Sequence, residues 1–311
     1  GPIGPMGGLV SAPRAEEALG AVRGGSDFDT DAFYIALSAW AKPFCMECSS
    51  PFLVKWYNDK RAETAGGLNS IEAPDTAVAY ALFTVPGYLD VVADYFKRKR
   101  PESNFVDGAT DELLDRLRAC LSPDLDALVV NTDVGPPYYH VQTVGSVAGV
   151  DQHIEVEDIT GEDAEAWRED LSDSLEESRD TKMWGTDPAT LRKVFGVNVH
   201  PVWGGWYAYR ALIVLRGASA EALPRPPPLK FLAQREARRI IGEYNLRHQE
   251  CLWRDLSLEH HPPERRYTTD EYLFFTEVSP AKRKRWLELR AAQMQRDEEL
   301  SSSSVLPCLT R

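Results

Sequence analysis

Cysteine is scarce in this chain of 311 residues and shows no paired pattern. The chain has an odd number of cysteines, and they are scattered along it: Cys45, Cys48, Cys120, Cys251 and Cys308. Small secreted domains carry even, closely spaced sets, so a disulfide framework is excluded and a reducing, cytoplasmic location is predicted. No apolar run approaches the roughly 18 residues that a membrane-spanning helix needs, which predicts a soluble protein.

Basic residues are also fewer than acidic residues in this chain. The chain has 35 Lys and Arg against 48 Asp and Glu, a formal net charge of −13. Binding to nucleic acids or anionic membranes depends on Lys and Arg, so neither is an expected partner, and an anionic ligand would need a local basic pocket. Hydrophobic residues at 43% and aromatic residues at 10% predict a globular protein with a substantial core.

The common catalytic signatures are missing. No GxGxxG, GxxxxGK[ST], HExxH or GxSxG occurs, so dinucleotide-binding oxidoreductases, P-loop enzymes, zincins and α/β-hydrolases lose their usual sequence support. Cys45 and Cys48 form a CxxC, but no second CxxC or nearby histidine completes a metal set. No metal site is predicted, and packing cysteines are favoured over a redox dithiol or half a zinc site. A regulatory disulfide stays an alternative.

The stretch from residue 196 to 217 organises the rest of the chain. It predicts a short strand at residues 197–200, a corner of breaker residues at 201–205 and a long strand at 206–215. Both faces of the long strand are apolar except at Arg210. A buried guanidinium must meet a carboxylate, carbonyls or an anionic ligand, and a structural salt bridge is the simpler interpretation. Gly204 and Gly205 favour a tight turn or a flat ligand against the backbone.

Periodicity predicts the remaining elements. Strands are expected at residues 51–58, 77–85, 126–132 and 138–148, and helices at 30–42, 86–97, 111–121 and 231–258. A capping box at Thr268 and Glu271 and a Ser279-Pro280 start predict two more helices. Strands and helices come in groups without a strict βαβ order, which indicates an α+β fold with an antiparallel sheet flanked by helices.

Composition suggests where the domain begins and ends. We expect a disordered extension at residues 1–25, one domain at 26–297 and a disordered tail at 298–311. An acidic stretch at about 155–190 is interpreted as a mainly exposed insertion, since it lacks EF-hand spacing and has few apolar residues to bury. The proline-rich residues 223–229 act as a stiff connector.

Two arginines outside the long predicted strand are candidates to line a pocket together with Arg210. Arg254 and Arg283 lie on late predicted helices. Guanidinium groups from separate segments, together with a diglycine-aromatic corner, suit an anionic, flat or aromatic ligand.

Several motifs resemble one family. His200-Pro201-x-x-Gly204-Gly205-Trp206-x-x-x-Arg210 is similar to the HPxxGGWxxxR signature of the cobalamin-processing proteins affected in combined methylmalonic aciduria and homocystinuria, type C. The resemblance extends, in order, to PFLVKWYN at residues 51–58, QT and VAG within 142–149, and later pairs: Tyr244-Asn245, Arg254-Asp255, Arg266-Tyr267 and Pro280-Ala281-x-Arg283. It covers residues 42–289, apart from the acidic insertion.

This resemblance implies a fold and an activity. The fold would be like that of flavin nitroreductases. The protein would bind cobalamin with its lower base detached, transfer alkyl ligands to the thiolate of glutathione, and remove cyanide reductively with a flavin, FMN or FAD. The type D cobalamin adaptor protein is an expected partner, and a monomer or weak homodimer is the expected state.

The resemblance also assigns residues. Arg210, Arg254 and Arg283 match glutathione-binding arginines, and Tyr267 matches a tyrosine near the thiol. The following positions match those that bind cobalamin or flavin: Asn131, Tyr139, His140, Val141, Gln142, Ser146, His153, Ile154, Glu155, Asn198, Gly204, Gly205, Trp206 and Tyr209. Two of them depart from the family pattern, since Ser146 stands where vertebrate relatives have a histidine and His153 replaces an aromatic residue.

Two other functions fit the same residues. A cobalamin carrier or adaptor would bind the cofactor without chemistry, and a flavin nitroreductase would hold flavin tightly and not bind cobalamin. Thiol-dependent loss of the alkyl group distinguishes the first from a dealkylase.

Overall fold

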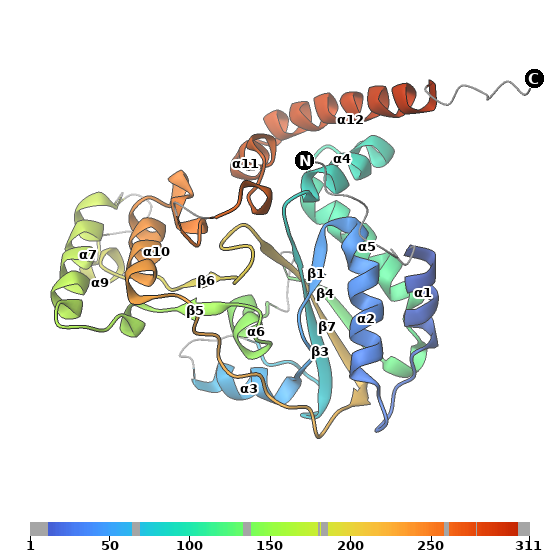
Figure 1. Cartoon of the computed structure of the whole chain (residues 1–311), viewed down its shortest axis with the longest axis horizontal. Helices are drawn as coiled ribbons and strands as arrows, with labels where there is room; N and C mark the ends of the chain where they lie inside the picture. The colour runs from blue at the N-terminus through green and yellow to red at the C-terminus, as the bar shows by residue number, and fades with distance from the viewer. Residues whose placement is uncertain are drawn as a thin grey trace, which may run out of the picture.

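The computed structural model describes residues 12–63, 69–132, 138–179, 181, 186–257, 261–277 and 279–303. Figure 1 shows a large sheet with helices beside it and a smaller lobe across from it. Each part has its own buried apolar cluster. No helix in these ranges is both long enough and apolar enough to span a bilayer.

The antiparallel sheet is formed by segments distant in sequence. Its strands within the described ranges are β1 (Met46–Cys48), β2 (Phe52–Leu53), β3 (Ala77–Thr84), β4 (Ala127–Asn131) and β7 (Ala208–Ser219). The order is β1-β3-β7-β4, and β2 also pairs with β3. All eight residues of β3 are buried, which explains its continuous apolar run. The predicted α+β class with an antiparallel sheet is therefore confirmed, while the nitroreductase-like assignment stays a prediction.

One side of the sheet is covered by helices (Figure 1). They are α1 (Ala12–Ala21), α2 (Thr30–Ala41) and α5 (Phe105–Cys120), while α4 (Tyr88–Lys99) packs on α5 at the end of the sheet. The predicted cap of α2 is confirmed, because the Asp29 carboxylate accepts from the backbone N–H groups of Asp31 and Ala32. The expected disorder of residues 1–25 is wrong over α1, where Ala15 and Leu19 are buried in the main core. Residues 1–11 lie outside the described ranges.

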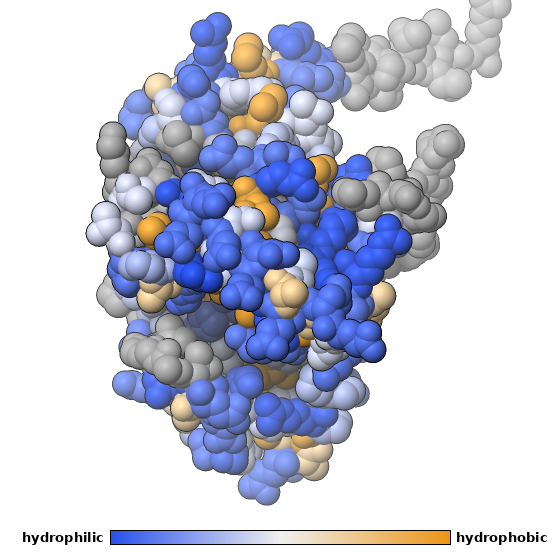
Figure 2. All heavy atoms as spheres, turned by 90° about the vertical axis from the view of Figure 1, so that its left-hand side faces the viewer, coloured by the Kyte–Doolittle hydropathy of each residue, from blue (hydrophilic) through white to orange (hydrophobic). Residues whose placement is uncertain are grey.

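The smaller lobe contains a second sheet. Its elements are β5 (Gln152–Ile154), β6 (Val197–Val199), α7 (Ala164–Ser178), α9 (Pro188–Leu191) and α10 (Gln234–Leu246). The acidic stretch is more ordered than expected, because α7 buries Leu171 and Leu175 in the same cluster as Ile240 and Ile241 of α10. The outer face of the lobe is mainly hydrophilic (Figure 2). The division into a single domain with an insertion stays a prediction.

Two predicted strands are helical. Residues 51–58 form only the two-residue β2 before α3 (Val54–Glu63), and residues 138–148 contain α6 (Val141–Val147). In α3 the polar second half, NDKRAE, propagates a helix that buries Trp56 and Tyr57. In α6, Gly145 lets the chain pack against Tyr209, because a Cβ added at this position would overlap the Tyr209 hydroxyl. Tertiary contacts outweigh β propensity at both places.

The C-terminal helices lie over the end of the sheet. The Thr268–Glu271 capping box is confirmed at the start of α11 (Thr269–Thr276). The last described helix, α12 (Pro280–Ser303), runs across α4 (Figure 1), buries Leu287, and its Arg290 is 2.7 Å from Asp90. The predicted tail is therefore helical as far as residue 303. Short 3-10 turns lie at Lys42–Phe44, Pro123–Leu125, Val156–Asp158, His248–Glu250, Leu252–Arg254 and Pro263–Arg265, so the helix expected at 231–258 ends at Leu246.

Candidate functional site

Arg210 and Arg283 line one cavity of about 310 Å³. β7 supplies Arg210, the first turn of α12 supplies Arg283, and the start of α5 closes a third side. The other lining residues are Ser103, Asn104, Phe105, Val106, Asp107, Phe275 and Pro280. Two of the three arginines predicted to converge are therefore brought together from segments far apart in the chain.

Aromatic rings support both guanidinium groups. The Cζ of Arg210 lies 5.9 Å from the centroid of the Tyr88 ring, and the Cζ of Arg283 lies 5.7 Å from that of Phe274. Nη2 of Arg283 also donates to the carbonyl of Phe275 at 3.4 Å. Within the described residues, the buried Nε of Arg283 has no hydrogen-bond partner. A ring face holds a cation without an acceptor atom, so this side chain keeps donor capacity for an anion.

A column of three aromatic rings joins this cavity to Arg254. The ring of Tyr267 is 5.4 Å from Trp206 and 5.2 Å from Phe275, measured between centroids. The Cζ of Arg254 lies 5.8 Å from the Tyr267 ring and 4.5 Å from that of Trp253. Burial raises the pKa of Tyr267, against the opposing effect of Arg254 and Arg210. The predicted thiol-site tyrosine thus lies between the arginines.

Gly204 and Gly205, the diglycine corner, pack directly against the segment that carries Arg254. A Cβ added to Gly204, whose φ is +58°, would overlap the carbonyl oxygen of Arg254, and one on Gly205 would be 2.5 Å from Trp253. The Gly205 N–H donates to the Arg254 carbonyl at 2.7 Å, and the Arg254 guanidinium donates back to the Gly205 carbonyl. Any other residue would separate the two segments, so the corner needs both glycines for packing.

His200 and Trp206 hold the two ends of this corner. The Nδ1 of His200 accepts from the backbone N–H groups of Val202 and Trp203 at 3.0 and 3.1 Å. Burial lowers the pKa of His200 to about 4, which keeps the imidazole neutral and able to accept. Trp206 donates from Nε1 to Asp255 at 2.8 Å. Both side chains are therefore engaged within the protein.

A second region gathers most of the predicted cobalamin or flavin residues. Five of them line a cavity of about 350 Å³ together with Lys60, Glu63 and Thr143: His140, Gln142, Ser146, His153 and Glu155. A neighbouring hollow of about 140 Å³ is lined by three more, Asn198, Gly205 and Tyr209, and also by Gln142. Gln142 faces both spaces, which makes it the link between them.

Asp151 organises the wall of these cavities, and no motif in the sequence singled it out. The residue is 2% exposed, and its carboxylate accepts from the Tyr207 hydroxyl at 2.7 Å, the Asn198 amide at 2.6 Å and the Tyr209 hydroxyl. Burial raises the pKa of Asp151, while these donors oppose that rise. The sequence signal that could have pointed to Asp151 is its position two residues before His153, directly before β5.

The same hydrogen bonds orient His153. Its Nδ1 lies 2.6 Å from the Asn198 side-chain oxygen, while the Asn198 amide nitrogen donates to Asp151. Nδ1 of His153 is therefore the donor in this hydrogen bond. Its Nε2 lies 3.2 Å from Glu155. A Cβ added to Gly196 would be 2.8 Å from the His153 ring, so the ring packs directly on the backbone.

Six predicted contact residues lie outside the cavity linings described above, and two of them, Gly204 and Trp206, belong to the diglycine corner. Ile154 is fully buried in the core of the smaller lobe. Asn131 ends β4 and donates to Asp111 at 2.9 Å. Tyr139 packs edge-on against Tyr57 at 6.3 Å between centroids, and Val141 begins α6. The side chain of Ile154 has no free surface to offer a ligand, so its assignment has the least support.

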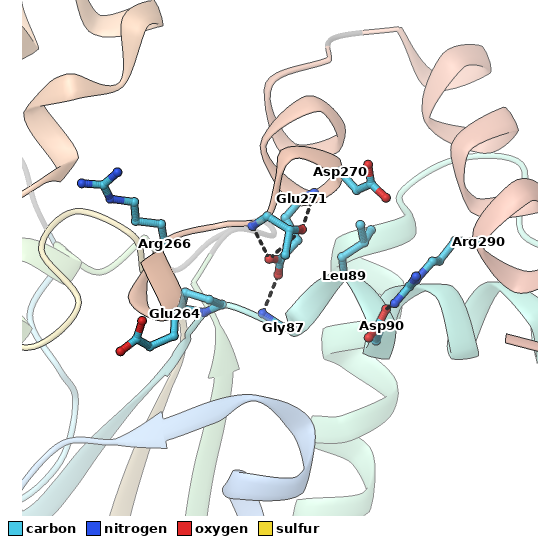
Figure 3. A pocket seen from close by; sticks show the side chains of 10 residues that line it. Gly87, Leu89, Asp90, Glu264, Arg266, Asp270, Glu271 and Arg290 are labelled. Atoms are coloured by element: carbon cyan, nitrogen blue, oxygen red, sulfur yellow. Dashed lines mark hydrogen bonds and ion pairs between the residues drawn. The ribbon is translucent and has the colours of Figure 1, made fainter. Parts of the chain in front are cut away.

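Another cavity, of about 340 Å³, lies at the start of α4 and α11 (Figure 3). Its charges are largely paired with one another or with the backbone: Glu271 accepts from the Gly87 N–H at 2.5 Å, and Arg290 lies 2.7 Å from Asp90. Figure 3 shows Arg266 pointing away from the helix ends, and it pairs with Asp255 at 2.9 Å. This cavity therefore has less capacity for an anionic ligand than the cavity that contains Arg283.

The described cysteines and acidic groups do not assemble into a metal centre. In the part of the chain that the structure describes, no group of three His, Cys, Asp or Glu side chains could hold a metal ion. Cys45 and Cys48 are free thiols, and burial raises the pKa of both. Such thiols are poor nucleophiles, in keeping with the packing role favoured from the sequence.

The fold and these side chains define an α+β protein with polar cavities on both sides of an aromatic corner. The chain belongs to the methylmalonic aciduria and homocystinuria type C family, whose model matches residues 45–287. This range includes every predicted site residue, and it also spans the acidic insertion.

Curated relatives and a solved structure agree with this assignment. The chain is similar to the cyanocobalamin reductase / alkylcobalamin dealkylase of Bos taurus, at 26% identity over 82% of this chain and 80% of that protein. It is 25% identical to the Homo sapiens protein of that name, over 84% and 82%. The structure of the C. elegans B12-trafficking protein CblC superimposes with a TM-score of 0.59 at 18% identity, covering 80% of this chain and 91% of that one.

Proposed function

We propose that this protein processes cobalamin: it binds the cofactor with its lower base detached, transfers the upper alkyl ligand to glutathione, and releases cyanide from cyanocobalamin with electrons from a flavin. A reducing compartment such as the cytoplasm would supply the thiol. The names of the relatives support the substrate class. The residues of this chain support the thiol chemistry.

The observation that carries the proposal is the arrangement of the three arginines. Arg210 and Arg283 share a cavity, and Arg254 lies on the same aromatic column. Glutathione has two carboxylates flanking its thiol, and a guanidinium binds a carboxylate through two parallel hydrogen bonds. Nearby guanidinium groups also lower the pKa of a thiol. The cavity therefore fits a thiol with two carboxylates better than one with none.

The chemical step needs no residue to act as a nucleophile. The glutathione thiol loses its proton to solvent, and the thiolate sulfur attacks the alkyl carbon. A carbon–sulfur bond forms, the carbon–cobalt bond breaks, and its electron pair stays on the metal, so cobalt(III) becomes cobalt(I). The arginines orient the thiolate, and the packed aromatic column limits the access of water.

The second region would hold the planar partners. The imidazoles of His140 and His153 and the amide of Gln142 line one cavity, and such donors and acceptors suit the amide-rich rim of a corrin or the polar edge of a flavin. A bound flavin would supply electrons for removing cyanide. Tyr209 presents its ring, because its hydroxyl is used by Asp151.

A spectroscopic titration tests the proposal. Methylcobalamin is added to purified protein with and without glutathione, and visible spectra and S-methylglutathione are followed. We expect a shift toward the base-off spectrum on binding and thiol-dependent loss of the methyl group. A spectral shift without product would indicate a carrier or adaptor. Tightly bound flavin with no cobalamin binding would indicate a nitroreductase, and either result contradicts the dealkylase.

A further inference from the structure

The arginine cavity contains one carboxylate among its lining residues. Asp107 lies in the first turn of α5 and lines the cavity with Arg210 and Arg283. Its side chain is partly buried. Arg210 lies over the Tyr88 ring, and the pKa of the Tyr88 phenol, raised by burial, is lowered by Arg210 and raised by Asp107. The acid and Arg210 therefore line the same cavity.

This mixture of charges is more selective than a purely basic pocket. Two guanidinium groups attract any small dicarboxylate, and they repel an ammonium group on the same ligand. The γ-glutamyl end of glutathione carries an ammonium beside its carboxylate. A carboxylate among the arginines removes that repulsion and offers the ammonium an acceptor.

We propose that Asp107 binds the α-ammonium of the γ-glutamyl end of glutathione and so selects this thiol over dicarboxylate thiols that lack an ammonium. The inference rests on the proposed use of glutathione at this cavity. It makes Asp107, whose charge is opposite to that of the arginines, a specificity-determining residue.

The competing explanation is structural. An acidic residue in the first turn of a helix interacts favourably with the helix dipole, and Asp107 has that position in α5. A purely structural role would support the cavity equally for every thiol. The two roles therefore differ in how a substitution acts on two thiols that differ only in the ammonium.

The experiment pairs Asp107→Asn with glutaryl-cysteinyl-glycine, which is glutathione with hydrogen in place of its ammonium. Wild-type protein should prefer glutathione by about tenfold in kcat/KM for demethylation, which corresponds to about 1.4 kcal/mol. Asp107→Asn should remove most of that preference by lowering kcat/KM for glutathione alone. Asp107→Glu should restore part of it. The control is Asp115→Asn, a change of the same charge at an exposed position on α5 that pairs with Arg118.

Equal losses for both thiols, or no loss for either, would overturn the inference. Calorimetric titration of each thiol into cobalamin-free protein gives a second readout that needs no turnover. If the protein proves to be a carrier, the dealkylation assay fails for the wild type, and the calorimetric preference still decides the role of Asp107. If Asp107→Asn does not fold, the comparison of wild type with Asp107→Glu on the two thiols decides it.

Discussion

The two polar regions of this protein satisfy their buried groups in opposite ways. At the arginine cavity, Arg283 rests on the ring of Phe274 and its Nε has no acceptor within the described residues. In the wall of the second region, Asp151 accepts from Tyr207, Tyr209 and Asn198. Ring contacts leave hydrogen-bond donors available, whereas a saturated network is rigid. The first arrangement suits binding an anion, and the second suits holding a shape.

Removing both guanidinium groups tests the binding side of this comparison and should have the largest effect. For Arg210→Ala combined with Arg283→Ala, we expect kcat/KM for glutathione to fall on the order of 1,000-fold, since each charge-assisted contact contributes about 1.5–3 kcal/mol. The dissociation constant for methylcobalamin should change little. Arg285→Ala, at an exposed position of α12, is the control. A matching loss of cobalamin affinity would show that the two regions are not separate.

Breaking the saturated network should reduce stability more than binding. Asp151→Ala leaves two buried tyrosine hydroxyls without their acceptor and removes one of the two acceptors of the Asn198 amide, and we expect the free energy of unfolding to fall by about 3 kcal/mol. Urea denaturation measures it. Asp173→Ala, which removes an exposed partner of Arg192, should cost less than about 1 kcal/mol. A small loss for Asp151→Ala would mean that the wall is not rigid.

The corner between the two regions should respond to acid. The pKa of His200 is about 4 in the folded protein and about 6.5 when unfolded. The unfolded state therefore binds more protons between these values, and stability is lost as the pH falls from about 6.5 to 4, by about 3 kcal/mol. His200→Asn keeps an acceptor for the N–H groups of Val202 and Trp203 and should flatten this part of the pH profile. An unchanged profile would contradict the assignment.

A change inside the aromatic column should have the smallest effect. Tyr267→Phe keeps the ring contacts with Trp206 and Phe275 and removes only the hydroxyl. We expect kcat/KM for glutathione to fall by about threefold or less, with stability nearly unchanged. A loss near that of the double arginine variant would show that the hydroxyl itself contacts the reacting thiol.

The strands of the central sheet were predicted from the sequence more accurately than the segments that pack against them. β3 lies where a continuous apolar run placed it, because burial on both faces leaves a clear pattern, and β4 lies within the predicted strand at residues 126–132. Residues 138–148 were expected to be a strand and contain α6, since the contact of Gly145 with Tyr209 and Asp151 comes from distant segments. A local pattern does not contain such contacts.

The site residues were likewise predictable only where the signal lies in the local sequence or in the family motifs. The convergence of Arg210 and Arg283 was expected through the family resemblance and is present in one cavity. The roles of these residues stay predictions. Asp151 was missed because an aspartate beside a strand is usually exposed, and its burial depends on donors supplied by β6 and by residues in and beside β7. Residues 12–21 were missed because small residues there form a helix only on the main core.

The position of Arg283 in the first turn of α12 links the ligand cavity to the seating of the last described helix. α12 is anchored on α4 through Leu287 and the Arg290–Asp90 pair. A chain interrupted before residue 280 would still contain the described strands of the central sheet, yet it would lack Arg283 and with it one side of the cavity. Loosening α12 would likewise displace Arg283, so truncation or proteolysis in this segment should weaken the proposed thiol binding more than it disturbs the central sheet.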